Sequence, residues 1–180
     1  MPKEASAAAI KFIYYFASSS DGFVADPQGD VDWLDAYHDV DYGITRFMKS
    51  IDALVMGRKT YEKSLTLGPW PSPRMTCVVL SNTRTEGPHV SRFWSEPLAG
   101  LPDFLASKGA RRVWMMGGGE AAASFLDAGL LDEIEQYVIP IVLGSGIPAY
   151  GKVDRQVPLT LIETRAFKNG VAMLKYRKKS

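Results

Sequence analysis

The chain has 180 residues with a formal net charge of +1, and 46% of them are hydrophobic. This length suffices for one domain with a sizeable core, and the near-neutral charge argues against a nucleic-acid partner because the basic tail at 175–179 is short. No secretory pattern or membrane-length apolar run is present and Cys77 lacks a partner cysteine, so we expect a cytoplasmic protein without a disulfide, with residues 1–9 disordered.

The first half of the chain alternates apolar runs with segments of helical pattern. Residues 10–17 are aromatic and apolar throughout, which is typical of a central strand buried on both faces. The sequence predicts further strands over 23–25, 53–56, 76–80 and 90–94, helices over 35–50 and from 57, a turn at 26–29 and a loop at 67–73.

The second half continues this alternation and then changes to a hairpin. We expect a helix over 97–108, a strand over 113–116, a helix over 120–128 and a strand over 132–143. Asn169-Gly170 between two further runs, 158–167 and 171–177, is a strong hairpin signal. The order predicts a single α/β domain over 10–180, with a mainly parallel central sheet and an antiparallel C-terminal hairpin.

Three of the predicted strands end in polar or glycine-rich turns, at Gly57, Ser81 and Gly117. In a parallel sheet these ends lie at one edge, where ligands bind. The glycines at 117–119 lead into a helix, which exposes backbone amides suited to a phosphate, although a tight turn alone would also explain them. Arg58, Lys59 and Arg84 add positive charge, so the rim favours an anionic nucleotide, and NADPH over NADH.

The chain has no metal-binding spacing, no Walker lysine motif and no nucleophile elbow. Hydride transfer from a bound nucleotide remains, because the protein then supplies binding, orientation and one proton. Each candidate substrate contact has a structural alternative: a turn for Asp21, the core for Trp33 and a solvated carboxylate for Asp41. The full set of candidate substrate contacts is Asp21, Trp33, Asp41, Met48 and Tyr61.

At these residues the chain resembles the dihydrofolate reductase superfamily, and more closely the branch that contains the RibD C-terminal reductase domain of bacterial riboflavin biosynthesis. The matching pieces are Ser20-Asp-Gly-Phe-Val-Ala25, Asp52-Ala-Leu-Val-Met-Gly-Arg-Lys-Thr-Tyr-Glu62, Leu80-Ser81, Met116-Gly-Gly-Gly119 and Val138-Ile-Pro-Ile-Val-Leu-Gly-Ser-Gly146.

The resemblance implies a three-layer dihydrofolate reductase-like fold, NADPH bound across the strand ends and reduction of a pteridine- or pyrimidine-like ring. It also implies a cis bond at Gly117–Gly118 and a homodimer that uses the apolar last strands. Counting back from Gly57 places Asp41 opposite the acid that serves folate, so Asp41 is the candidate catalytic residue. The expected cofactor-binding residues are Gly57, Arg58, Lys59, Thr60, Ser81, Asn82, Arg84, Gly117, Gly118, Gly119 and Glu120.

Two rival functions stay open at this point. One is a non-catalytic NADPH-binding or sensor protein, because no obvious proton donor other than Asp41 is present. The other is a flavin-binding reductase, which would be yellow when purified. A structural assembly protein would not need the 57–60 segment or the triple glycine.

Overall fold

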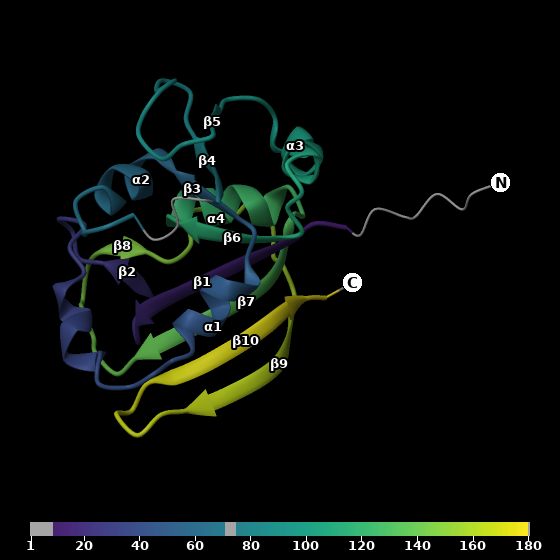
Figure 1. Cartoon of the computed structure of the whole chain (residues 1–180). Helices are drawn as coiled ribbons and strands as arrows, with labels where there is room; N and C mark the ends of the chain where they lie inside the picture. Colours follow the sequence, from purple (N-terminus) through teal and green to yellow (C-terminus); the bar gives the residue numbers. More distant parts are fainter. Residues whose placement is uncertain (1–8, 71–74, 180) are drawn as a thin grey trace.

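The computed structural model describes residues 9–70 and 75–179, so the disorder expected over 1–9 lies outside the described residues except for Ala9. An eight-stranded sheet in the order β5-β4-β3-β6-β1-β7-β10-β9 forms its centre (Figure 1). Its strands are β1 (Lys11–Ser19), β3 (Ala53–Gly57), β4 (Thr76–Leu80), β5 (Arg92–Trp94), β6 (Arg112–Gly117), β7 (Leu131–Ile139), β9 (Leu159–Ala166) and β10 (Ala172–Lys178). A separate ribbon pairs β2 (Phe23–Ala25) with β8 (Ile147–Pro148).

The strands from β5 to β7 in this order are parallel, and β10 runs antiparallel to both β7 and β9. Figure 1 shows the arrows of β1, β6 and β7 pointing one way and that of β10 the other. The predicted parallel sheet with an antiparallel C-terminal hairpin is therefore confirmed.

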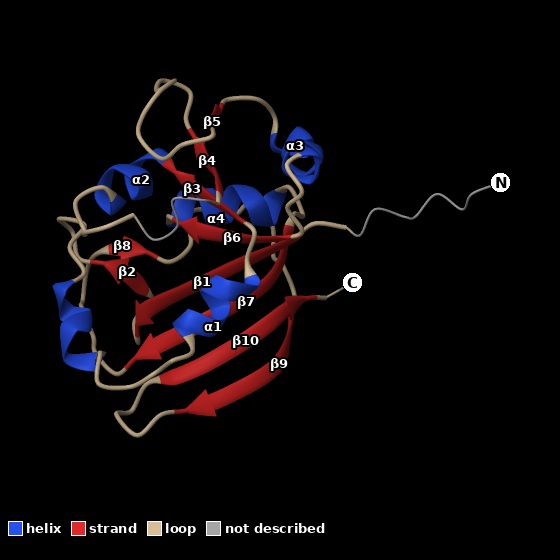
Figure 2. Ribbon diagram, in the orientation of Figure 1, coloured by secondary structure: helices blue, strands red, loops and turns tan. Residues whose placement is uncertain are grey.

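The sheet lies between two helical layers (Figure 2). Strand β1 supplies both cores because its side chains alternate: Phe12 and Tyr14 belong to one cluster, Ile13 and Tyr15 to the other. The first cluster packs under α3 (Leu101–Ser107) and α4 (Gly119–Asp127), and the second under α1 (Ile44–Ser50) and α2 (Arg58–Ser64). The three-layer fold is confirmed.

The single helix predicted over 35–50 is wrong. The chain forms a 3₁₀ helix, η1 (Asp32–Tyr37), and then a turn before α1. Gly43, the N-cap residue of α1, has a φ of +85°, which is incompatible with the interior of a helix, and the Asp41 carboxylate accepts a hydrogen bond from the Gly43 N–H at 2.7 Å. Asp41 therefore lies on a turn and not on a helix.

The strand predicted over 132–143 and the helix predicted over 97–108 are also shorter in the structure. Strand β7 ends at Ile139, not at 143, because Pro140 has no N–H group for the ladder. The helix predicted over 97–108 begins as a 3₁₀ turn, η2 (Leu98–Gly100), and becomes α-helical only in α3, with a proline in its first turn. In the part of the chain that is described, no helix combines the length and the apolar character needed to cross a bilayer.

Candidate functional site

The predicted grouping of strand ends is confirmed. In the register, Gly57 of β3 lies opposite Leu80 of β4, and Met56 lies opposite Gly117 of β6. The three strands are neighbours and parallel, so Gly57, Ser81 and Gly117 follow one another along a single rim of the sheet. Ligands bind at such carboxyl ends in open α/β sheets.

The triple-glycine turn presents bare backbone to this rim. The predicted cis bond between Gly117 and Gly118 is confirmed, and Gly117 has a φ of +118°. A Cβ atom at Gly118 would lie 3.3 Å from Oγ1 of Thr60, so the first turn of α2 packs directly against these glycines. Helix α4 starts at Gly119, and the N–H groups of its first turn have no acceptor within the helix. Glu120 is exposed, with its carboxyl group beside Gly151.

Three charged side chains form a cluster on the β3–β4 side of the rim. Nη1 of Arg58 lies 2.9 Å from both carboxylate oxygens of Glu62, and Nη1 of Arg84 lies 3.3 Å from Oε1. The hydrogen bond from Arg58, with the charges of both arginines, lowers the pKa of Glu62. The cluster joins α2 to the loop after β4, and Lys59, the residue after Arg58, is exposed.

Ser81 shapes the loop that carries Arg84. Its Oγ accepts hydrogen bonds from the N–H groups of Arg84, at 2.9 Å, and Thr83, at 3.3 Å. Its own N–H donates to the carbonyl of Trp94, which fixes the start of the loop to β5. Ser81 thus positions Arg84, while Asn82 is exposed at the turn.

The prediction that Tyr61 contacts a substrate is wrong. Its side chain is 0% exposed in the core, and its hydroxyl donates to the Pro88 carbonyl at 3.0 Å. Tyrosine at position 61 follows the helical spacing that turns it inward from α2. Its ring instead supports Arg84, whose Cζ lies 5.2 Å from the ring centre.

The remaining substrate candidates lie on the other side of the rim. Asp21 accepts hydrogen bonds from the N–H groups of Leu143, at 3.1 Å, and Gly144, at 2.7 Å, so it ties the end of β1 to the loop after β7. A hydrogen bond from Ser19, together with these two, lowers the pKa of Asp21. Trp33 in η1 and Met48 in α1 are half-buried against the second core cluster.

Near Asp41 the structure reveals a pair of tyrosines that sequence reasoning missed, Tyr15 and Tyr137, whose ring centres lie 5.0 Å apart. The Tyr137 hydroxyl lies 2.8 Å from a Glu135 carboxylate oxygen and 3.0 Å from the Tyr42 carbonyl. Burial raises the pKa of Tyr15 to about 12, and the charges of Glu135 and Asp41 also raise it. The pair comes from β1 and β7, far apart in sequence, so no local pattern could have indicated it.

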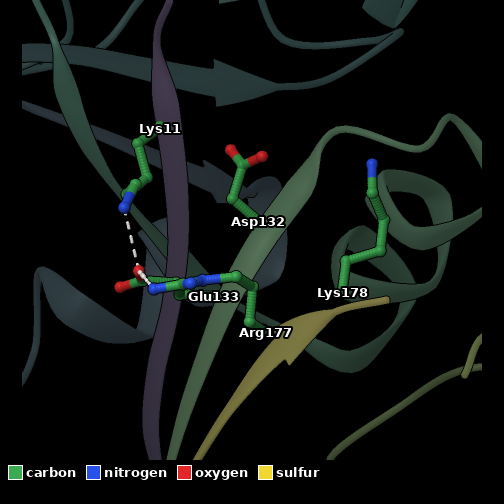
Figure 3. A pocket seen from close by; sticks show the side chains of 5 residues that line it. All are labelled: Lys11, Asp132, Glu133, Arg177 and Lys178. Carbon is green, nitrogen blue, oxygen red and sulfur yellow. Dashed lines mark hydrogen bonds and ion pairs between the residues drawn. The ribbon is translucent and has the colours of Figure 1, made fainter. Parts of the chain in front are cut away.

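A charged cavity of about 260 Å³ lies at the opposite edge of the sheet (Figure 3). It is lined by Lys11, Asp132, Glu133, Arg177 and Lys178. Lys11 and Glu133 form an ion pair at 2.9 Å across β1 and β7. Lys178 donates to the Gly129 carbonyl, and the Phe12 N–H donates to Asp132. The polar groups that line the cavity therefore bind neighbouring parts of the chain and link the start of β1, the start of β7 and the end of β10.

Comparison with known proteins identifies the family of this chain. The model of the RibD C-terminal domain matches residues 11–173. The chain belongs to the RibD C-terminal domain family. It is 32% identical over 167 residues to the uncharacterized protein YwjB of Bacillus subtilis, covering 91% of this chain and 95% of YwjB. It is 30% identical over 148 residues to the riboflavin biosynthesis protein RibD of Corynebacterium ammoniagenes, covering 73% of this chain and 43% of that protein.

Solved structures of this family and of dihydrofolate reductase share the fold. A protein from Shewanella sp. PV-4 assigned to riboflavin biosynthesis superposes with a TM-score of 0.86 and 30% identity, over 95% of this chain and 100% of that one. Dihydrofolate reductase from Enterococcus faecalis, solved as a complex with NADP(H), gives a TM-score of 0.68 at 17% identity, over 94% and 97% of the two chains. Membership of the RibD C-terminal family indicates a reductase-like protein.

Proposed function

We propose that the protein is an NADPH-dependent reductase that transfers a hydride to a small pteridine- or pyrimidine-like ring. The observation that carries the proposal is the rim itself. Bare glycine backbone at Gly117–Gly119 and an arginine pair, Arg58 and Arg84, follow neighbouring parallel strands. A dinucleotide with a pyrophosphate and a 2′-phosphate on its adenosine half offers one anionic group to each of these two sets of donors.

The residues at the rim fit such a cofactor. At Gly57 a Cβ atom would stand 3.8 Å from the N atom of Gly118, and at Gly118 one would stand 3.3 Å from Thr60, so the backbones of these two strand ends meet with no side chain between them. We assign the pyrophosphate to Gly117–Gly119 and the start of α4, and the 2′-phosphate to Arg58, Lys59 and Arg84. The bound cofactor supplies the hydride, and the protein orients it.

We assign the substrate to the side of the rim that carries Asp41, Trp33 and Met48. The half-buried side chains of Trp33 and Met48 offer apolar surface for a flat ring. Asp41 is the candidate proton source, because its carboxyl group is exposed and lies near the Tyr15–Tyr137 pair.

A non-catalytic NADPH-binding protein is the second candidate, and one observation favours it. The Asp41 carboxylate already accepts the Gly43 N–H at 2.7 Å and so has a structural task in the turn before α1. A sensor would keep the phosphate-binding rim and would not need an acid.

Titration with NADPH, followed by tryptophan fluorescence and calorimetry, tests the proposal. We expect saturable binding at micromolar cofactor, and Arg58→Ala should weaken NADPH more than NADH. Arg46→Ala, on the exposed face of α1, is the control for loss of one positive charge. Oxidation of NADPH with a panel of pteridines and ribosylaminopyrimidines then separates a reductase from a sensor. A folded protein that binds no NADPH refutes both.

A further inference from the structure

We infer that Glu62 is a positioning residue that sets the preference for a 2′-phosphorylated cofactor, by holding Arg58 and Arg84 together as one anion-binding unit. This inference rests on the proposed function. The Glu62 carboxylate receives Arg58 at 2.9 Å on both oxygens and Arg84 at 3.3 Å on one of them. A single acid thus joins guanidinium groups from α2 and from the loop after β4.

Arg84 is held from three directions. Its Nε donates to the Glu86 carbonyl at 3.0 Å, its Cζ stands 5.2 Å from the ring centre of Tyr61, and its Nη1 meets Glu62. Tyr61 is itself fixed, because its ring is wholly buried and its hydroxyl is bonded to Pro88. The only charged group among these three supports is Glu62, so it contributes the charge–charge attraction that positions Arg84.

Two guanidinium groups that contact the same carboxylate would repel each other if that carboxylate were removed. Glu62 offsets that repulsion and still leaves a formal charge of about +1 on the cluster, counted over the two arginines and the one carboxylate. An arginine has five N–H donors. Within residues 9–70 and 75–179, the side-chain hydrogen bonds of Arg58 all use Nη1, so Nε and Nη2 can face a ligand.

The remaining donors define the class of ligand. Planar guanidinium groups with N–H pairs match the oxygens of a phosphate monoester, and two of them match it better than one. A ribose with a 2′-hydroxyl in that position offers no anion. The same carboxylate could instead compete with phosphate for the arginines, and then its removal would tighten binding. The sign of the effect therefore decides between positioning and competition.

The test measures binding of four probes to five forms of the full chain by calorimetry. The probes are 2′,5′-ADP, 5′-AMP, NADPH and NADH. The forms are wild type, Glu62→Ala, Glu62→Gln, Glu62→Asp and Asp30→Asn. Asp30 forms an ion pair with Lys63, which lies on α2 like Glu62. Its substitution breaks this ion pair and leaves the contacts of the two arginines in place. Thermal unfolding of each form reports on the fold.

If Glu62 positions the arginines, Glu62→Ala and Glu62→Gln should weaken the binding of 2′,5′-ADP and NADPH by about tenfold. The dissociation constants of 5′-AMP and NADH should change by less than about twofold. Glu62→Asp should recover part of the loss, and Asp30→Asn should bind like wild type. Tighter binding of NADPH, an equal loss of affinity for NADPH and NADH, or no change in affinity overturns the role of Glu62 and leaves the proposed function intact. A wild-type protein that binds neither NADPH nor 2′,5′-ADP overturns both.

Discussion

The N–H group of Gly151 donates a hydrogen bond to the carbonyl oxygen of Gly119, with 2.8 Å between the two atoms. The loop after β8 therefore packs directly on the start of α4. A Cβ atom at Gly119 would stand 2.4 Å from the Pro148 carbonyl oxygen, which is backbone and cannot move aside cheaply. The contact explains why glycine is required at this point of the rim.

Gly119→Ala should accordingly destabilise the fold by about 2 kcal/mol, because the side chain over-packs a backbone contact. Urea unfolding followed by tryptophan fluorescence measures this. Gly57→Ala is the matched control, since its φ of −73° suits any residue and its Cβ atom would have neighbours at 3.8 Å. We expect it to stay within about 0.5 kcal/mol of wild type. Equal stability of the two variants would contradict the packing described for Gly119.

Asp41→Asn tests the proposed proton source. If the carboxylic acid protonates the substrate ring, turnover should fall by about a hundredfold while the dissociation constant for NADPH is unchanged. Steady-state kinetics with a substrate from the panel, together with NADPH titration, measures both quantities. Asp39→Asn is the control, because Asp39 lies on the same exposed turn and binds Asn169. Unchanged turnover in Asp41→Asn would remove this residue from the chemistry.

Glu133 should make the stability of the protein depend on acid pH. It is 5% exposed, and burial alone would raise its pKa, but the hydrogen bond from Lys11 and the charges of Lys11, Lys175 and Arg112 lower it below the ordinary 4.5. A carboxyl group with a lowered pKa in the folded state stabilises above about pH 4.5, and this contribution disappears as the pH falls through the folded value.

Glu133→Gln should therefore lower the free energy of unfolding by about 1–3 kcal/mol at pH 7, a moderate loss because several of its partner cations are partly exposed. The variant should also lose less stability than wild type as the pH falls below about 4.5. Urea unfolding between pH 3 and pH 7 gives both results. Glu86→Gln in the exposed loop after β4 is the control and should change little. A variant with the acid sensitivity of wild type would show that other carboxyl groups control it.

We propose that the protein is a homodimer and that β9 contributes to its interface. All eight residues of this edge strand are exposed, and Leu159, Leu161 and Ile162 expose 38%, 50% and 40% of their surface. An exposed edge strand with apolar side chains can pair with a strand of another molecule, and a partner subunit would cover it. Leu161→Glu should shift the mass measured by light scattering toward a monomer.

Leu67→Glu provides the comparison for this variant, because Leu67 is 60% exposed and lies outside the sheet, between α2 and β4. It should leave the mass unchanged. A wild-type protein that is monomeric at micromolar concentration would rule out the proposed dimer, and a dimer that tolerates Leu161→Glu would place its interface elsewhere.

The sequence predicted those parts of the fold that depend on local chemistry. The buried strand β1, the glycine turn and the Asn169-Gly170 hairpin each have patterns confined to a few neighbouring residues, and all three are confirmed. The single helix predicted over 35–50 is wrong because Gly43, the N-cap residue of α1, has a positive φ that interrupts helical geometry. Glycine within a helical pattern was the available signal.

At the candidate site, the sequence identified which strand ends gather but not what the side chains do there. Arg58 and Arg84 were named, yet Glu62, which binds both, was not, because an acid four residues after an arginine is common on any helix. The assignment of Tyr61 to the substrate is wrong because the direction of its side chain depends on how α2 docks on the sheet. Such relationships arise from tertiary packing and have no short-range pattern.

The place of β1 in the sheet has a consequence for biosynthesis. It pairs with β6 and β7, whose partner residues lie about a hundred positions further along the chain. While the ribosome extends the polypeptide, the aromatic first strand must wait until residue 139 has emerged before both its edges are covered. Such long-range pairing slows folding, and it leaves an apolar nascent segment exposed to aggregation until the pairing is complete.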